Sequence, residues 1–350
     1  MKRVLLIGAG HAHAVVLREL ARQPLLGARI DFVSPRALEL YSAMVPGVIA
    51  GHYARAAAEI DFRALAERAF CEFLQGAVTR LDAGRRAAQL SDGRQLGYDF
   101  ISLNVGSAID ASIPGAELAL RSRPFPALLD GLGTPRRIAI AGGGAAGAEL
   151  AMALRFRGAE AVTLYSDEPA FAQPLAGRVA RVLRRAGVDH RPGMALEAIE
   201  PGMIVRSGAT RQEFDLVILA TGARALGWPR EAGLACDEAG YVEVTRTLQS
   251  VSHPEVFAAG DCASMEGWRE PKSGVHAVRQ GETLHRNLVA AVTGAPLSEY
   301  RPRPRALSIL ACGARYALAM WGDWAVEGRW VWRWKDRIDR RWMESLRASR

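Results

Sequence analysis

Short apolar runs that end at glycine, each followed by apolar residues at helical spacing, organise the chain. Residues 4–7 are all apolar and lead into Gly8 and Gly10, and residues 14–21 then place apolar side chains on one face of a helix. Residues 137–141 begin a second copy of the same order. The pattern therefore predicts two units of strand, tight turn and helix.

Both turns have the residue spacing of a phosphate-binding turn. The second is a complete Gly-x-Gly-x-x-Gly made by Gly142, Gly144 and Gly147, whereas the first has His13 at its third position. In a Rossmann unit this turn lets the backbone approach a pyrophosphate, whose charge meets free N–H groups at the helix N-terminus. One Gly-x-Gly is a weak signal, but two copies predict two bound dinucleotides. Because a glycine at the third position lets helix and strand pack closely, His13 calls the standard geometry of the first turn into question.

The two units also end alike. Strands are predicted over 98–106 and 214–222, and both run into a glycine. The second strand of each unit is predicted over 28–33 and 161–165. This internal repeat indicates a duplicated dinucleotide-binding domain. We therefore expect an α/β fold with two Rossmann-like dinucleotide-binding domains and a C-terminal amphipathic helix.

The repeat also sets the predicted domain boundaries. Residues 1–120 and 245–320 form a discontinuous first domain, 121–244 form the second, and 321–350 form a basic, tryptophan-rich C-terminal segment. Within these limits the pattern predicts a helix over 59–69, a hairpin over 77–90, a strand over 241–248, a helix over 275–293 and a pair of strands over 307–321.

The composition fits a globular chain with a buried core, because 49% of its 350 residues are hydrophobic. The chain enters a strand directly after Met1, which leaves no room for a signal peptide. No run reaches the roughly 18 to 20 apolar residues that a membrane span needs, so we expect a cytoplasmic location. The cysteines stand far apart in the sequence, which argues against a metal site and against a redox disulfide between near neighbours: Cys71, Cys236, Cys262 and Cys312.

The net charge of +8 is concentrated at the C-terminus. Residues 329–350 hold eight Lys or Arg against three acids, a net charge of +5. On a helical wheel, one sector of this segment is apolar and the opposite sector carries arginines. The apolar sector comprises Trp330, Val331, Trp334, Ile338, Trp342 and Leu346, and the basic sector comprises Arg333, Arg337, Arg340 and Arg347.

A helix of this kind predicts an anchor in the plane of a membrane, because indoles favour the headgroup region and arginines meet anionic lipid. The alternative is a helix that packs its indoles on the protein's own core or on a second subunit, so a homodimer stays open. Nucleic acid is not expected as a partner, because the indoles form one continuous stripe and are not interleaved with the basic residues.

Several motifs, taken in order, resemble those of the FAD-dependent pyridine nucleotide oxidoreductases. They are the two glycine turns, residues 33–36, Tyr41-Ser42-x-Met44-x-Pro46-Gly47, Ala220-Thr221-Gly222 and Ala259-Gly260-Asp261. The likeness spans almost the whole chain. Within this family the chain most resembles the type II NADH dehydrogenases, nearest the subgroup also found fused to selenide, water dikinase, with which it shares 49–52, 277–281 and 328–336.

The resemblance implies FAD on the first unit and NAD(P)H on the second. Asp261 would bind the ribitol of FAD or its phosphate. Asp167 would accept a hydrogen bond from a ribose hydroxyl, although Ser166 takes the usual position, and no arginine follows to hold a 2′-phosphate, so NADH is favoured over NADPH. The residues expected to bind the two cofactors are Gly8, Gly10, His11, Ser34, Arg36, Asn104, Gly106, Gly142, Gly144, Gly147, Asp167, Thr221, Gly222, Gly260 and Asp261.

The resemblance also implies two catalytic residues. Glu149 matches a glutamate that assists proton delivery near the flavin, and Gln280 matches a segment that lines flavin and quinone. The alternatives are that Glu149 only complements the dipole of its helix and that Gln280 is an ordinary exposed polar residue. His11 and His13 depart from the small residues of the type II pattern, and they either shuttle protons beside the flavin or pack and bond locally.

A flavin without a cysteine pair must pass its electrons directly to an acceptor. The expected function is therefore an FAD-dependent NAD(P)H dehydrogenase that passes electrons from NADH to a quinone-like acceptor, peripheral on the cytoplasmic face of a membrane. One alternative takes a selenium or sulfur species linked to selenophosphate metabolism and depends on a reactive Cys262 or Cys312. Another is a redox-responsive protein that binds FAD and NADH with little turnover.

Overall fold

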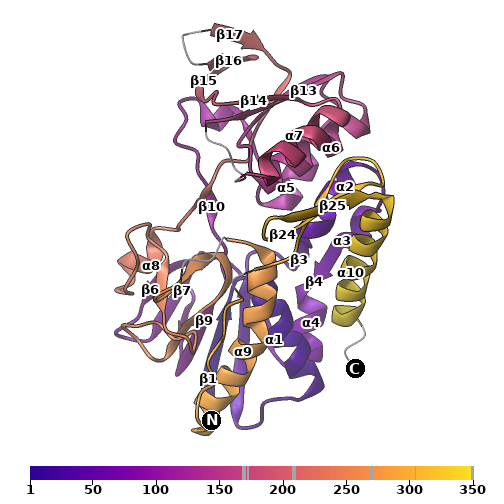
Figure 1. The fold of residues 1–350 in the computed structure, drawn as a ribbon. Helices are drawn as coiled ribbons and strands as arrows, with labels where there is room; N and C mark the ends of the chain where they lie inside the picture. The colour runs from indigo at the N-terminus through magenta and orange to yellow at the C-terminus, as the bar shows by residue number, and fades with distance from the viewer. Residues whose placement is uncertain (168–170, 172, 207–209, 269–271, 304, 348–350) are drawn as a thin grey trace.

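The computed structural model describes residues 1–167, 171, 173–206, 210–268, 272–303 and 305–347. Two α/β units lie one above the other in Figure 1, and the C-terminal helix runs along the flank of the lower unit. Each unit is built on a parallel sheet of five strands. The fold confirms the predicted α/β class with two Rossmann-like units and a C-terminal helix.

The sheet of the first unit has the strand order β21-β9-β1-β2-β5. Its strands alternate poorly between polar and apolar residues because helices and neighbouring chain cover both faces, and β1 is buried along its last four residues. Helices α1 and α9 pack against each other in front of this sheet (Figure 1). The elements are β1 (Lys2–Ile7), β2 (Ala28–Ser34), β5 (Glu72–Gln75), β9 (Phe100–Leu103), β21 (Val256–Ala258), α1 (His11–Arg22), α4 (Phe62–Arg68) and α9 (Gly274–Thr293).

The second unit repeats this arrangement with the strand order β11-β18-β12-β13-β14. In both units the first strand lies at the centre, with the second strand on one side and the late strand on the other. The structure thus shows the duplication that the sequence predicts. The elements are β11 (Leu120–Arg121), β12 (Arg137–Ala141), β13 (Ala161–Ser166), β14 (Asp189–Pro192), β18 (Leu216–Leu219), α5 (Phe125–Gly131), α6 (Ala145–Arg157) and α7 (Leu175–Arg185).

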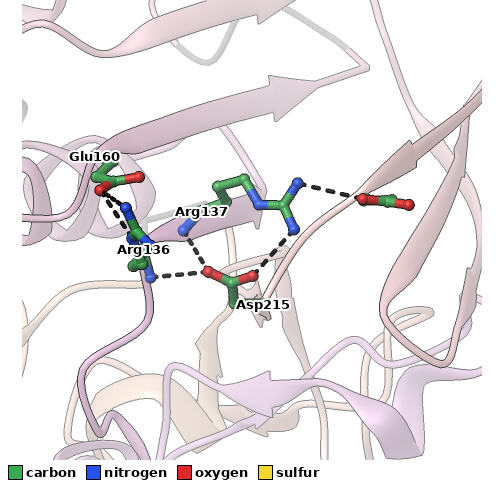
Figure 2. A network of polar contacts seen from close by, with 5 residues as sticks. Arg136, Arg137, Glu160 and Asp215 are labelled. Carbon is green, nitrogen blue, oxygen red and sulfur yellow. Dashed lines mark hydrogen bonds and ion pairs between the residues drawn. The ribbon is translucent and has the colours of Figure 1, made fainter.

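An aspartate at the start of the late strand closes each unit in the same way. In the first unit, Asp99 accepts the backbone N–H of Arg3 at 2.7 Å. In the second, Asp215 accepts the backbone N–H groups of Arg136 and Arg137 at 2.9 and 2.8 Å, and its other oxygen contacts the Arg137 guanidinium (Figure 2). These contacts lie at the amino ends of the strands, so they fix the sheets at the edge opposite the glycine turns.

Smaller sheets flank the two units. The first unit carries an antiparallel sheet of β6 (Val78–Asp82), β7 (Ala87–Leu90) and β8 (Gln95–Gly97), and the second carries β15 (Leu196–Glu200), β16 (Met203–Arg206) and β17 (Thr210–Glu213). The two-stranded sheets are β3 (Leu38–Leu40) with β4 (Glu59–Asp61), β10 (Ala108–Ile109) with β19 (Ala223–Arg224), and β20 (Val242–Val244) with β22 (Ala263–Met265). The short helices are η1 (Ser42–Met44), α2 (Val45–Ile49), α3 (Arg55–Ala58), η2 (Ala116–Leu118), α8 (Trp228–Glu231) and η3 (Gly260–Cys262).

Several predicted elements differ from the structure. The strand predicted over 241–248 covers only Val242–Val244, and the hairpin predicted over 77–90 gains a third strand, β8. The helix predicted over 59–69 begins only at Phe62, because Glu59–Asp61 pairs with β3 and the Asp61 side chain caps the helix by accepting the Ala64 N–H at 2.9 Å. The strand pair predicted over 307–321 is present as β23 (Ser308–Ala311) and β24 (Ala317–Trp321), but a third strand, β25 (Trp324–Gly328), joins it. This sheet leads directly into α10 (Arg329–Arg347).

The face of α10 that packs on the protein also differs from the predicted apolar sector. That face is turned so that Val331 and Leu346 are buried, whereas Trp330, Trp334 and Ile338 are 57%, 40% and 40% exposed. The helical wheel treated these five residues as one surface, but the packing divides them. The buried face contains a charged pair among its apolar residues: Val331, Lys335, Asp339, Met343 and Leu346. Residues 348–350 of the predicted basic segment lie outside the described residues.

Candidate functional site

One cavity of about 830 Å³ lies between the two units, at the carboxyl ends of the parallel strands. It is bordered by the turns after β1 and β12, by the chain after β9 and β18, and by the start of α9. Ligands of open α/β sheets bind at this edge, where the strand order reverses. Most of the residues that the sequence predicts to bind cofactors line it: Gly10, His11, Asn104, Gly106, Gly142, Gly144, Asp167, Thr221, Gly222 and Asp261.

The turn after β1 leaves no room for side chains. A Cβ on Gly10 would stand 2.1 Å from the side-chain oxygen of Asn104, and Gly8 has a φ of +98°. Asn104 accepts the backbone N–H of His13 at 3.1 Å and donates to the carbonyl of Ala259 at 2.7 Å. The Asn104 amide therefore joins the turn after β1 to the end of β21, and these contacts hold open a backbone cradle at the N-terminus of α1.

His13 replaces the third glycine without opening the turn. Its Nδ1 lies 2.7 Å from the carbonyl oxygen of Gly8, and its Nε2 lies 2.8 Å from the hydroxyl of Ser102 on β9. The side chain is fully buried, and burial lowers the pKa of His13 to about 4. It is a neutral structural link between α1, the turn and the sheet. In the second unit, by contrast, a Cβ on Gly147 would stand 1.9 Å from the carbonyl oxygen of Gly142.

His11 lines the cavity and differs from His13 in its contacts. Its Nε2 is buried and has no hydrogen-bond partner among the described residues, and its ring meets the Tyr41 ring edge-on at a centroid distance of 5.5 Å. Burial lowers the pKa of His11, and the negative charge of Asp261 raises it. A buried nitrogen without a partner is costly, so this atom indicates a place for a ligand group.

Asp261 lies in the turn after β21, beside Gly260, which has a φ of +72°. Its carboxylate accepts a hydrogen bond from Arg123 at 3.0 Å and lies 3.5 Å from the Ser107 hydroxyl. Gln280 is buried on α9, and its side-chain oxygen accepts the backbone N–H of Gly260 at 2.6 Å. Gln280 therefore positions the turn that carries Asp261, and it lines a smaller neighbouring cavity of about 270 Å³ instead of the main one.

The second glycine turn opens to the same cavity from the other side. A Cβ on Gly142 would stand 2.2 Å from the carbonyl oxygen of Ala220, whereas Gly144 and Gly222 face open space. The Thr221 hydroxyl donates to the carbonyl of Asp110 and fixes the chain after β18. Free N–H groups at the start of α6 thus face the cavity, which is the arrangement that binds a phosphate.

Glu149 lies on α6 and reaches the cavity wall. Its Oε1 accepts the backbone N–H of Ala311 at 2.7 Å. Burial raises the pKa of Glu149 to about 7, and the positive charge of Lys335 lowers it. Near neutral pH this carboxyl group is therefore divided between its protonated and ionised forms, which suits a group that gives and takes a proton.

Ser34 and Arg36 lie at the end of β2 and line neither the main cavity nor its smaller neighbour. The Ser34 hydroxyl donates to the Arg36 carbonyl at 2.8 Å, and the Arg36 guanidinium lies 2.7 Å from Glu39. Arg123 and Lys335 were not predicted from the sequence. Nothing in the pattern around Arg123 marks it, and Lys335 directly follows Trp334 in a segment that suggested a surface helix.

Among the described residues, the cysteines form no disulfide and belong to no metal-ligating cluster. All four are free, and no cluster of three His, Cys, Asp or Glu in the same part of the chain could hold a metal ion. Burial raises the pKa of both Cys262 and Cys312, and that of Cys312 reaches about 12. The thiolate form that attacks sulfur or selenium is therefore disfavoured at both.

The comparisons with known proteins agree with this geometry. A family model described as pyridine nucleotide-disulphide oxidoreductase matches residues 2–281. Ferroptosis suppressor protein 1 of Taeniopygia guttata is 27% identical over 254 residues, which cover 66% of each chain, and the type II NADH:quinone oxidoreductase of Haemophilus influenzae is 22% identical over 373 residues, covering 86% of this chain and 83% of the other. The sulfide:quinone oxidoreductase structure from Aquifex aeolicus has a TM-score of 0.82 at 17% identity, covering 100% of this chain and 92% of that one.

The chain spans slightly less than two thirds of ferroptosis suppressor protein 1, and the solved structure is similar in fold alone. The predicted likeness to type II NADH:quinone oxidoreductases is confirmed at low identity, whereas the link to selenide, water dikinase stays a prediction. FAD and NAD(P)H are the cofactors of the matched family, which confirms the two expected from the sequence. Since the match covers most of its length, this chain belongs to the pyridine nucleotide-disulphide oxidoreductase family.

Proposed function

We propose that the protein is an FAD-dependent NADH dehydrogenase that passes electrons to a quinone-like acceptor. The observation that carries this proposal is that both glycine turns and the buried Glu149 open to one cavity. A cavity of about 830 Å³ at the facing edges of two dinucleotide-binding sheets can bring the reacting ends of two dinucleotides together.

The first unit fits FAD. Gly8 and Gly10 leave the backbone bare where a pyrophosphate would lie, and the partnerless Nε2 of His11 offers a hydrogen bond beside them. Asp261 is held in place by Arg123 and by its turn, as a carboxylate that binds ribitol hydroxyls must be. Asn104, Gly106 and Gly260 would support this set, while a ribose contact from Ser34 and Arg36 remains a prediction.

The second unit fits NADH. Gly142, Gly144 and Gly147 form the turn at the start of α6, and Thr221 lies directly beside Gly142 on the chain after β18, which also brings Gly222 to the cavity. Asp167 lines the cavity at the end of β13, where a carboxylate accepts from a ribose hydroxyl and repels a 2′-phosphate. We therefore propose NADH as the donor, and expect Asp167→Asn to narrow the ratio of KM for NADPH to KM for NADH.

Bound FAD supplies the chemistry of accepting a hydride and passing electrons onward. The chain's own residues orient the two dinucleotides and handle the proton. Reduction of a quinone to a hydroquinone by NADH takes up one proton from outside the two reactants. Glu149 would give this proton to an acceptor oxygen and regain it from solvent, since its pKa of about 7 suits both steps.

The acceptor is proposed to be quinone-like because no thiol in the structure is placed or activated to relay electrons. The name of one relative points the same way, since it is a type II NADH:quinone oxidoreductase. A selenium or sulfur acceptor would need Cys262 or Cys312, whose pKa values are raised by burial.

We also propose that α10 touches a membrane on its cytoplasmic face. No helix among the described residues is long and apolar enough to cross a bilayer. However, the indoles of Trp330 and Trp334 are exposed on α10, and those of Trp321 and Trp324 are exposed at the β24–β25 turn. Exposed indoles on a basic helix suit the headgroup region of an anionic bilayer.

The deciding experiment is anaerobic reduction of the FAD-loaded protein. NADH should bleach the flavin absorbance within the mixing time of a stopped-flow instrument, NADPH should do so at least tenfold more slowly, and a soluble ubiquinone analogue should restore it. A flavin that neither nucleotide bleaches would refute the dehydrogenase and leave the redox-responsive binding protein. Bleaching without recovery on addition of quinone would refute the acceptor alone.

A further inference from the structure

The packed face of α10 buries an ion pair. Lys335 and Asp339 are 7% and 3% exposed, and the Lys335 ammonium lies 2.6 Å from the Asp339 carboxylate. Taking two charges out of water carries a desolvation penalty for each ion, and apolar residues of the same size would often pack there as well. A buried pair on a helix that otherwise needs only apolar contacts therefore calls for a reason beyond stability.

Both partners are tied to one wall of the main cavity. The Lys335 ammonium donates to the carbonyl of Ala43 at 2.6 Å, and the Tyr41 hydroxyl donates to the Asp339 carboxylate. Ser42, Ala43, Val45 and Pro46, in the same segment, line the cavity. The pair thus lies directly behind this wall, and its position is fixed by hydrogen bonds from Tyr41 and to Ala43.

The pair lies close to Glu149, because the Glu149 carboxylate accepts the N–H of Ala311 on β23 and α10 packs against β23. The Lys335 charge lowers the pKa of Glu149, and the Asp339 charge raises it. Among the described residues, the other titratable groups that interact with Glu149 or Asp339 are Tyr41 before η1, Cys312 after β23, Asp336 on α10 and Tyr53 before α3. Among the charged groups of the described residues, Lys335 and Asp339 are those with a resolved effect on the pKa of Glu149.

We propose that Asp339 is a positioning residue for the proton of Glu149. It holds Lys335 in place and offsets its charge, so that Glu149 keeps a proton to deliver when the acceptor arrives. According to this proposal, the buried face of α10 contributes to the acceptor site, while the opposite face of the helix is exposed. The proposal rests on the proposed function, because a proton on Glu149 matters only if the protein reduces an acceptor. The protonation of Glu149 can nevertheless be measured in protein that is not turning over.

The test compares charge changes of opposite sign on one helix. Asp339→Asn leaves the Lys335 charge uncompensated, so the pH at which Glu149 loses its proton should fall by about one unit or more. Lys335→Met removes the positive charge, so the same pH should rise. Glu344→Gln removes a negative charge from the exposed side of α10 and should change nothing.

The first measurement is the infrared band of the protonated carboxyl group, followed over a pH titration of the FAD-loaded protein. The band that Glu149→Gln abolishes belongs to Glu149. Asp339→Asn should shift its midpoint to lower pH and Lys335→Met to higher pH, while Asp339→Glu should restore the wild-type midpoint. An unchanged midpoint in folded Asp339→Asn protein would overturn the proposal, whether or not the protein oxidises NADH.

The second measurement separates the two half-reactions. In Asp339→Asn, the rate of flavin reduction by NADH should keep its wild-type pH profile. The rate of flavin reoxidation by a ubiquinone analogue falls as Glu149 loses its proton, and this fall should begin at a lower pH in Asp339→Asn than in the wild type. Should Asp339→Asn fail to fold, as judged by its thermal transition, Tyr41→Phe removes a hydrogen bond to Asp339 and should shift the same midpoint. Equal shifts in both half-reactions would show a general loss of structure and refute the specific role.

Discussion

The side-chain oxygen of Asn104 lies 3.1 Å from the backbone nitrogen of His13, although 91 residues separate them. The other end of the same amide donates to the carbonyl of Ala259 at 2.7 Å. Asn104 is buried, so neither contact is exchanged with water. One side chain therefore fixes both the first glycine turn and the turn of Asp261, which are the two backbone segments proposed to hold FAD.

Replacement of Asn104 should therefore weaken FAD binding. Asn104→Ala leaves a buried N–H and a buried carbonyl without partners, at about 1–3 kcal/mol for each group. We expect the affinity for FAD to fall at least tenfold, measured as flavin bound per chain in a titration of apoprotein. Asn287 makes a comparable buried link, between Thr247 and Ser298. Asn287→Ala should lower the melting temperature but leave FAD affinity unchanged, and equal losses in both variants would contradict the role of Asn104.

The second turn gives a matched prediction for NADH. A Cβ on Gly147 would stand 1.9 Å from the carbonyl oxygen of Gly142, so Gly147→Ala must push α6 away from the turn. Flavin reduction by NADH should slow at least tenfold while FAD content stays normal, because the first unit is untouched. Gly177→Ala, on α7 of the same unit, meets nothing within 4 Å and should leave NADH oxidation unchanged. Loss of FAD from Gly147→Ala would show that the two units do not act separately.

The duplication was predictable because its marks are local in the sequence. A strand, a glycine turn and a helix follow one another within about 20 residues, and the repeat of Asp99 and Asp215 lies at equivalent places in both units. The contact partners of the site were not predictable in the same way. Arg123 meets Asp261 across 138 residues, and Lys335 reaches Ala43 across 292, so no spacing in the chain signals either pair.

The C-terminal helix shows why a wheel alone misassigns a face. The helical wheel assigned Val331 to the same apolar sector as Trp330 and Trp334 because all three are apolar. It left Lys335 out of that sector because Lys335 is charged. In the structure Lys335 is buried because Asp339 and a carbonyl satisfy its ammonium, while the indoles of Trp330 and Trp334 remain exposed. A charged side chain can be buried when its partner of opposite charge lies one turn away on the same helix. A helical wheel considers each residue alone and therefore does not show such an ion pair.

Because of His13, the free energy of unfolding of the protein should decrease as the pH is lowered. Its pKa is lowered from 6.5 to about 4 in the folded state, so the unfolded chain binds a proton between these values and the folded chain does not. The contribution of the His13 imidazole to the free energy of unfolding is fully present above about pH 6.5, and it is lost as the pH falls towards 4. We expect the contribution of His13 to the free energy of unfolding to drop by about 2 kcal/mol between pH 7 and pH 5.

Urea denaturation at several pH values would measure this effect. Burial also lowers the pKa values of His11, His190 and His285, so they add to the slope with the same sign. Glu149, whose pKa burial raises to about 7, adds to the slope with the opposite sign, so the effect of His13 is the difference between the wild type and a variant without this histidine. His13→Gln keeps a polar side chain at the site without a titrating group and should flatten the slope by the share due to His13. A slope that is as steep in His13→Gln as in the wild type would assign the acid sensitivity to the other histidines.

The exposed indoles of α10 predict vesicle binding that depends on both indole and charge. Trp330→Ser with Trp334→Ser should weaken binding to vesicles of anionic phospholipid at least tenfold, and added salt should weaken it in the wild type, because arginines on the same helix meet the lipid charge. Phe70 is 77% exposed and lies outside this surface, so Phe70→Ser is the matched control and should bind as the wild type does. If the double variant instead converts a dimer to a monomer and leaves vesicle binding intact, the exposed indoles form a subunit interface, since the same apolar area cannot be covered by both partners at once.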